Sequence, residues 1–94
     1  MAKVYEFSAA WCGPCKAFAN TIKKASELDK FKDVDFRMMD IEEDDDAPDL
    51  VAKYRVMSVP TVVITDDNGN ELGRTTGNVP LTVLEKEIDK ALDL

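Results

Sequence analysis

Apolar positions along the chain follow two periods, which together predict four strands and three helices. Strand candidates are short runs rich in β-branched or aromatic residues, and helix candidates carry apolar residues three or four positions apart. The predicted elements are strands at 4–7, 34–38, 61–65 and 71–75 and helices from Pro14 to about 29–32, at 48–54 and after Pro80. This β-α-β-α-β-β-α order predicts an α/β fold with a four-stranded mixed sheet and helices on both of its faces.

The composition is typical of one small globular domain covering residues 1–94, and we expect a monomer. The chain is 45% hydrophobic and 33% charged, which excludes a disordered protein. No apolar run approaches the roughly 18–20 residues of a membrane span, and the first residues lack the apolar core of a signal peptide. We therefore expect a cytoplasmic protein. With no histidine and two cysteines, the chain lacks His-based catalysis and the ligands for a four-ligand zinc site, so no metal site is expected.

Negative charge is concentrated in residues 40–49, which hold seven acids and no base, whereas the rest of the chain is balanced. A net charge of −7 argues against nucleic-acid or anionic-lipid binding through bulk charge. The favoured interpretation is a solvated loop leading into a helix whose positive N-terminus attracts acids. A patch that steers a partner is the second. A calcium site is the third, and it lacks the glycine-punctuated spacing of an EF-hand.

The most informative segment is Trp11-Cys12-Gly13-Pro14-Cys15-Lys16, between the first strand and the first helix. This position puts Cys12 at a helix N-terminus, where free backbone N–H groups and the helix dipole stabilise a thiolate. Cys15 follows one helical turn later, so the two sulfurs can meet. We expect Cys12 to face outward and attack a disulfide, and Cys15 to face inward and resolve the intermediate.

Two other interpretations of the cysteine pair are weaker. A structural disulfide closing four residues contributes roughly 2 kcal/mol in the loop-entropy model, against about 3 for fifteen residues. Cytosolic disulfides are also usually transient. A zinc half-site shared between two chains lacks a second ligand pair nearby.

The full WCGPCK motif, with a strand before it and a helix after it, resembles the active site of thioredoxins. Ser58-Val59-Pro60-Thr61 is similar to the cis-proline loop of that family, Gly69 falls in its hairpin turn, and Gly77 falls at its substrate-facing glycine. The resemblance covers nearly the whole chain. Thioredoxins usually carry a further strand and helix before the cysteine-bearing unit, and only about ten residues precede Trp11. The implied fold is therefore the minimal, glutaredoxin-sized thioredoxin fold.

The resemblance implies a surface that contacts substrate. A cis bond before Pro60 would face the two sulfurs and leave the backbone of Val59 free to pair with an extended substrate segment. An ordinary strand-start proline, a simple turn at Gly77 and a core tryptophan at Trp11 are the alternatives. The implied contact residues are Trp11, Gly13, Pro14, Val59, Pro60 and Gly77.

Glu6 is an unexpected residue, because a central strand usually reads as a nearly continuous apolar run. The family usually has a buried aspartate here, which relays the proton of the inner cysteine. A desolvated glutamate would have a raised pKa suited to accepting a proton from Cys15. The alternative is a glutamate that extends to the surface without a role.

Two positions near the cysteine pair depart from the thioredoxin pattern, and both bear on how the reactivity of the pair is set. Ser8 stands where thioredoxins usually place a second tryptophan, and Arg37-Met38-Met39-Asp40 occupies the region of a lysine often found near the buried acid.

Three functions compete. The first is a general protein-disulfide reductase that uses Cys12 and Cys15 without a cofactor, takes electrons from thioredoxin reductase or an equivalent donor, and acts on disulfide-containing proteins. The second is a glutathione-linked, glutaredoxin-type oxidoreductase, which the size favours and Gly13-Pro14 disfavours. The third is a thioredoxin-fold binding subunit that clamps a partner enzyme.

Overall fold

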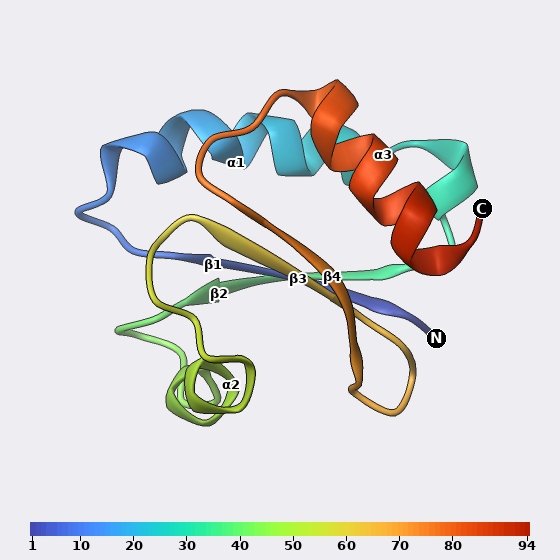
Figure 1. The fold of residues 1–94 in the computed structure, drawn as a ribbon. Helices are drawn as coiled ribbons and strands as arrows, with labels where there is room; N and C mark the ends of the chain where they lie inside the picture. The colour runs from blue at the N-terminus through green and yellow to red at the C-terminus, as the bar shows by residue number, and fades with distance from the viewer.

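Strand β1 (Lys3–Ser8) occupies an interior position in a four-stranded sheet of order β2-β1-β3-β4 (Figure 1). The computed structural model describes all 94 residues. β1 pairs in parallel with β2 and antiparallel with β3, which pairs antiparallel with β4. The remaining elements are α1 (Gly13–Ser26), a 3₁₀ turn (Asp29–Phe31), β2 (Asp35–Asp40), α2 (Ala47–Tyr54), β3 (Thr61–Thr65), β4 (Glu71–Thr76) and α3 (Leu81–Leu92). The predicted order and mixed sheet are confirmed.

The first helix is shorter than predicted. The Ser26 hydroxyl donates a hydrogen bond to the Lys23 carbonyl at 2.6 Å, and the backbone of Leu28 is extended. Such a side-chain bond offers the backbone an alternative to continuing the helix. The chain therefore leaves α1 at Ser26 and re-forms only a 3₁₀ turn at Asp29–Phe31.

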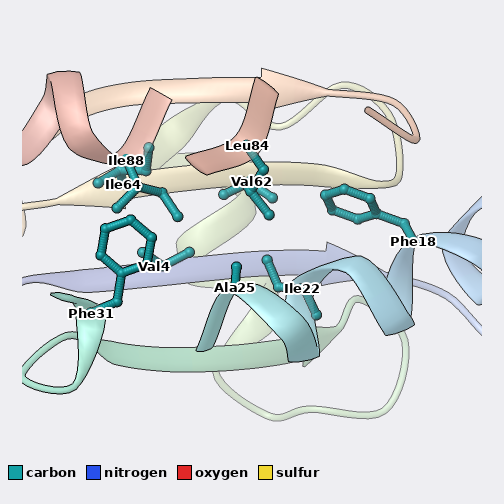
Figure 2. Packing of buried hydrophobic residues seen from close by; sticks show 9 residues of the cluster. All are labelled: Val4, Phe18, Ile22, Ala25, Phe31, Val62, Ile64, Leu84 and Ile88. Carbon is teal, nitrogen blue, oxygen red and sulfur yellow. The ribbon is translucent and has the colours of Figure 1, made fainter. Parts of the chain in front are cut away.

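Helices α1 and α3 cover one face of the sheet, and α2 covers the other (Figure 1). Between the sheet and the α1/α3 layer lies the larger core, shown in Figure 2, whose members are Val4, Phe18, Ile22, Ala25, Phe31, Val62, Ile64, Leu84 and Ile88. A smaller core under α2 contains Tyr5, Phe7, Met39, Ala47, Tyr54 and Val63. Side chains of β1 alternate between the two cores, as a strand period of two requires.

The sheet topology brings three connections together at one end of the sheet. The β1–α1 turn, the β2–α2 loop and the α2–β3 loop all lie at the left in Figure 1. These segments carry Cys12, most of the acidic run and the Val59–Pro60 pair, and Cys15 follows in the first turn of α1. No helix is both long and apolar enough to cross a membrane.

Candidate functional site

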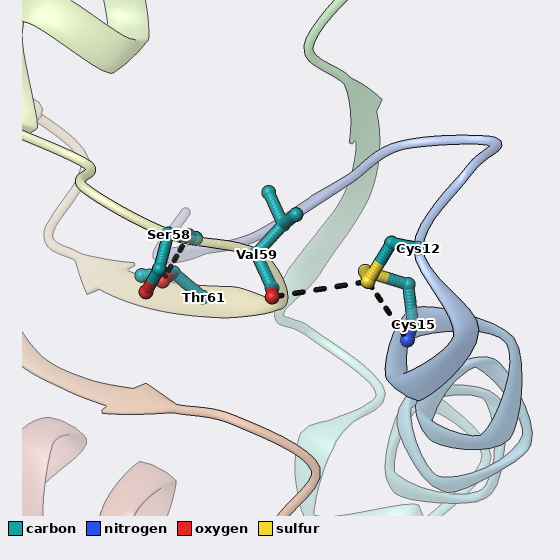
Figure 3. Close-up of a disulfide and its surroundings, with 5 residues drawn as sticks. All are labelled: Cys12, Cys15, Ser58, Val59 and Thr61. Carbon is teal, nitrogen blue, oxygen red and sulfur yellow. Dashed lines mark hydrogen bonds between the residues drawn. A yellow bond between two sulfur atoms is a disulfide. The ribbon is translucent and has the colours of Figure 1, made fainter.

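Cys12 and Cys15 form a disulfide, with their Cα atoms 5.2 Å apart. This separation is within the normal range for disulfides. The Cys15 backbone N–H donates a hydrogen bond to Cys12 Sγ at 3.1 Å, and the Val59 carbonyl oxygen lies 3.8 Å from the same sulfur (Figure 3). Cys12 Sγ is therefore held between the first turn of α1 and the loop before β3.

Cys12 is the N-cap of α1, as predicted. Its backbone is extended, and Gly13 and Pro14 form the first helical turn. Pro14 fits there because its missing N–H has no partner in a first turn. The free N–H groups and the dipole of α1 favour negative charge on Cys12 Sγ once the disulfide is reduced.

Exposure does not separate the two cysteines, so the prediction that Cys12 faces outward is wrong for the disulfide form. Cys12 is 4% exposed and Cys15 is 5% exposed. Both pack with buried Ala9, and Val59 and Ile41 cover them from neighbouring loops. What distinguishes the cysteines is their surroundings, because only Cys15 lines the cavity that holds Glu6.

The Val59–Pro60 peptide bond is cis, as the resemblance implies. The loop is fixed by two hydrogen bonds: Thr61 Oγ1 donates to the Ser58 carbonyl at 2.7 Å, and the Gly77 N–H donates to the Pro60 carbonyl at 2.8 Å. Gly77 has a positive φ of 83° and open space where a Cβ would stand. Because glycine has no side chain, the backbone at this edge of the site stays accessible.

Trp11 is 66% exposed and does not belong to the core, so the core alternative for this residue is wrong. It borders an apolar hollow of about 320 Å³ that we call the front groove. The front groove is lined by Trp11, Ile41, Pro48, Val51, Val56, Met57, Ser58 and Val59, and none of these side chains is ionisable. The sequence analysis predicted Trp11 and Val59 but not the other six residues of this lining, because they come from segments whose proximity only the fold shows.

Glu6 is 1% exposed, so the surface alternative for this residue is wrong. Neither carboxyl oxygen has a hydrogen-bond partner. Burial raises the pKa of Glu6 from 4.5 to about 7, because desolvation disfavours the charged form.

Glu6 borders a second hollow, of about 200 Å³, which we call the rear cavity. The rear cavity is lined by Glu6, Ser8, Ala9, Ala10, Cys15, Lys16, Ala19, Met38 and Asp40. It therefore brings the buried carboxyl and the inner cysteine to one space. Polar and charged side chains from β1, α1 and β2 surround that space.

Comparison with known proteins agrees with this geometry. The family model described as Thioredoxin matches residues 2–90. A thioredoxin of Mycoplasma genitalium is 39% identical over 84% of this chain and 72% of its own length, and a thioredoxin of Staphylococcus epidermidis is 35% identical over 96% and 82%. This chain belongs to the thioredoxin family. Its Cys12–Cys15 pair is the redox-active disulfide of a thiol–disulfide oxidoreductase, and the protein is a protein-disulfide reductase.

Solved thioredoxin structures superpose on almost the whole chain. The thioredoxin of Trypanosoma brucei brucei matches with a TM-score of 0.81 at 28% identity, over 100% of this chain and 77% of that one. Mitochondrial thioredoxin 3 of Saccharomyces cerevisiae, in its oxidized form, matches with 0.78 at 34% identity, over 99% and 78%. These relatives favour the reductase over the glutathione-linked hypothesis.

The two departures from the thioredoxin pattern both lie at the rear cavity. Met38 is the register partner of Glu6 on β2, and Ser8 is a small residue on the same wall. A methionine cannot pair with a carboxylate as a lysine can, and Lys16, which lines the same cavity, forms no ion pair with Glu6. No three side chains of the types that bind metals converge in the structure.

Proposed function

We propose that Cys12 is the attacking residue and Cys15 the resolving residue of this reductase. In the reduced protein, the Cys12 thiolate attacks one sulfur of a substrate disulfide, so a Cys12–substrate disulfide forms and a substrate thiolate leaves. The Cys15 thiolate then attacks Cys12 Sγ, which re-forms the Cys12–Cys15 disulfide and releases the second substrate thiolate. Two electrons pass from the dithiol to the substrate. The observation that carries this assignment is the position of Cys12 as the N-cap of α1.

Glu6 is the proposed proton acceptor for Cys15. Both groups line the rear cavity, and the carboxyl has no competing partner. A base whose pKa lies near the working pH combines a useful ionised fraction with driving force for proton transfer. Glu6, with a pKa of about 7, meets that condition.

The proposed substrate surface comprises Trp11, Gly13, Pro14, Val59, Pro60 and Gly77. An extended segment laid beside Val59 can pair with its backbone, in the manner of strand addition. The exposed ring of Trp11 and the bare backbone of Gly77 flank that path.

The proposed partners are disulfide-containing proteins and a thioredoxin reductase or an equivalent electron donor. The proposed cofactor set is empty, because the dithiol itself carries the electrons. We place the protein in the cytoplasm as a monomer. Support comes from the thiol chemistry, since cytosolic disulfides are usually transient and catalytic.

Matched cysteine variants test the assignment. Cys15→Ser is expected to accumulate a Cys12–substrate disulfide, visible by non-reducing electrophoresis and mass spectrometry, because the resolving thiol is missing. Cys12→Ser is expected to form no such adduct under the same conditions. Equal trapping by both variants, or trapping by Cys12→Ser alone, would reverse the assignment.

The reduction potential tests the reductase against the glutathione-linked alternative. Equilibration in graded dithiol buffers, followed by Trp11 fluorescence, gives the potential of the Cys12–Cys15 pair. Thioredoxin at about −270 mV and glutaredoxins at about −200 to −230 mV set the scale. We expect a value near or below that of thioredoxin. A value well above the glutaredoxin range would contradict a reductase.

A further inference from the structure

The front groove neighbours the disulfide through Val59, and its wall joins the segment that carries most of the negative charge. Ile41 and Pro48 line the groove, and the acids of residues 42–46 lie between them in the chain. One end of an apolar hollow is therefore continuous with an exposed acidic loop, which we call the acidic rim (residues 42–46).

The acidic rim has no ion-pair partner: Arg37 shares a hollow with Asp46 but pairs with Asp35 instead. No acid of residues 40–49 forms an ion pair, and the carboxylates of Glu42, Glu43 and Asp45 accept no hydrogen bond. The Asp40 and Asp44 carboxylates are different, because they accept backbone N–H groups and hold the loop. The groove lining contributes no base that could compensate the charge.

Two apolar side chains of the front groove are also largely exposed to solvent. Met57 is 91% exposed, and Trp11 is 66% exposed. A flexible methionine and an aromatic ring suit a surface that accommodates varied apolar side chains. A ligand that complements both surfaces therefore carries an apolar side chain, which fits the front groove, and a positive charge, which fits the acidic rim.

We infer that this groove selects disulfide substrates in which the reactive cysteine is flanked by an apolar residue and, a few residues away, by lysine or arginine. The inference rests on the proposed reductase function and adds a substrate class to it. The apolar side chain occupies the groove beside Trp11 and Met57, and the basic residue meets the acidic rim. Complementary charge raises the rate of encounter and selects among partners more than it raises affinity.

Three peptide disulfides test the inference. They are disulfide-linked homodimers of one short peptide with a Val-Cys core, and they carry lysine, glutamine or glutamate at the same two flanking positions. Reduction by the reduced protein is followed through Trp11 fluorescence. Each rate is divided by the rate with dithiothreitol, which removes differences in intrinsic disulfide reactivity.

The lysine peptide is expected to react about tenfold faster than the glutamate peptide at low ionic strength, with glutamine between them. At 0.5 M salt the ratio is expected to fall to about twofold, because exposed charges are screened. Replacing the valine of the lysine peptide by serine is expected to slow its reduction about threefold, because the groove loses apolar contact.

Two double variants with the same change in net charge separate local from global effects. Glu42→Lys/Asp45→Lys is expected to abolish the preference for lysine. Glu27→Lys/Asp33→Lys alters exposed acids at the C-terminal end of α1 and before β2, and is expected to keep the preference. A wild-type ratio near one, or equal loss in both variants, would overturn the inference while leaving the reductase intact. Failure to reduce any of the three peptides would instead overturn the proposed function.

Discussion

The front groove and the rear cavity lie on different sides of the cysteine pair and differ in chemistry. The front groove has apolar walls and no ionisable side chain, and its Trp11 and Met57 are exposed. The rear cavity contains a buried carboxyl, a lysine and an aspartate, and it reaches Cys15. Disulfide exchange needs both environments, because a substrate must be desolvated and a thiol must lose a proton. In the proposed mechanism, the substrate therefore contacts the front groove, whereas the Cys15 proton passes to Glu6 in the rear cavity.

The largest expected effect comes from the rear cavity and concerns stability. Glu6 has a pKa of about 7 when folded, against an ordinary value of 4.5. Between these values the folded state holds a proton that the unfolded chain has released, so the free energy of unfolding falls as pH rises. The loss attributable to Glu6 is roughly 3 kcal/mol, and it is nearly complete by about pH 8.

Urea unfolding of the oxidised protein from pH 4 to 8 measures this loss. The relevant quantity is the difference between wild type and Glu6→Gln, since it cancels the titration of other groups. The wild type is expected to lose stability relative to the variant as pH rises, and the loss is expected to level off near pH 8. If the free energy of unfolding of the two proteins changed in parallel with pH, Glu6 would not be desolvated. The chemical difference between the rear cavity and the front groove would then be contradicted.

An intermediate effect is expected at the front groove. Trp11→Ala removes an exposed ring of the kind that often dominates interfaces, so kcat/KM for insulin reduction is expected to fall about tenfold. Stability is expected to stay within about 0.5 kcal/mol, because the ring is mostly exposed. Trp11→Phe is expected to recover part of the activity. An unchanged kcat/KM in Trp11→Ala would remove this residue from the substrate surface.

The smallest expected effect concerns Gly77, at the rim near Pro60. A Cβ there would meet no atom, but φ is +83°, so Gly77→Ala is expected to cost about 1 kcal/mol through the backbone alone. Gly13 is the matched control, because it has equal open space without a positive φ. Urea unfolding of Gly13→Ala is expected to show no such loss. Equal behaviour of the two variants would contradict the backbone explanation.

The sequence predicted the order of the elements, and it left open whether Glu6 is buried or extends to the surface. Hydrophobic periodicity located the strands, and the element order placed β1 in the sheet interior, where a carboxyl must be desolvated. The burial of Cys12 was not predictable, because Val59 covers it from a loop 47 residues away in the chain. The position of Met38 beside Glu6 depends on the register of β1 and β2, which the pattern alone does not specify.

The proposed transfer of the Cys15 proton to Glu6 can be measured in the resolving step. A mixed disulfide between Cys12 and thionitrobenzoate is prepared at pH 4 and then transferred to buffers from pH 6 to 9. Attack by Cys15 releases thionitrobenzoate, which is followed at its visible absorbance. With Cys12 blocked, Cys15 is the one free thiol in the protein.

For the wild type, we predict that the release rate rises with pH and that its midpoint lies near the Glu6 pKa of about 7. Glu6→Gln is expected to be at least about tenfold slower at pH 7 and to lack that midpoint, because the variant lacks the buried carboxyl proposed to accept the Cys15 proton. Superimposable rate profiles for the two proteins across pH 6 to 9 would contradict the claim.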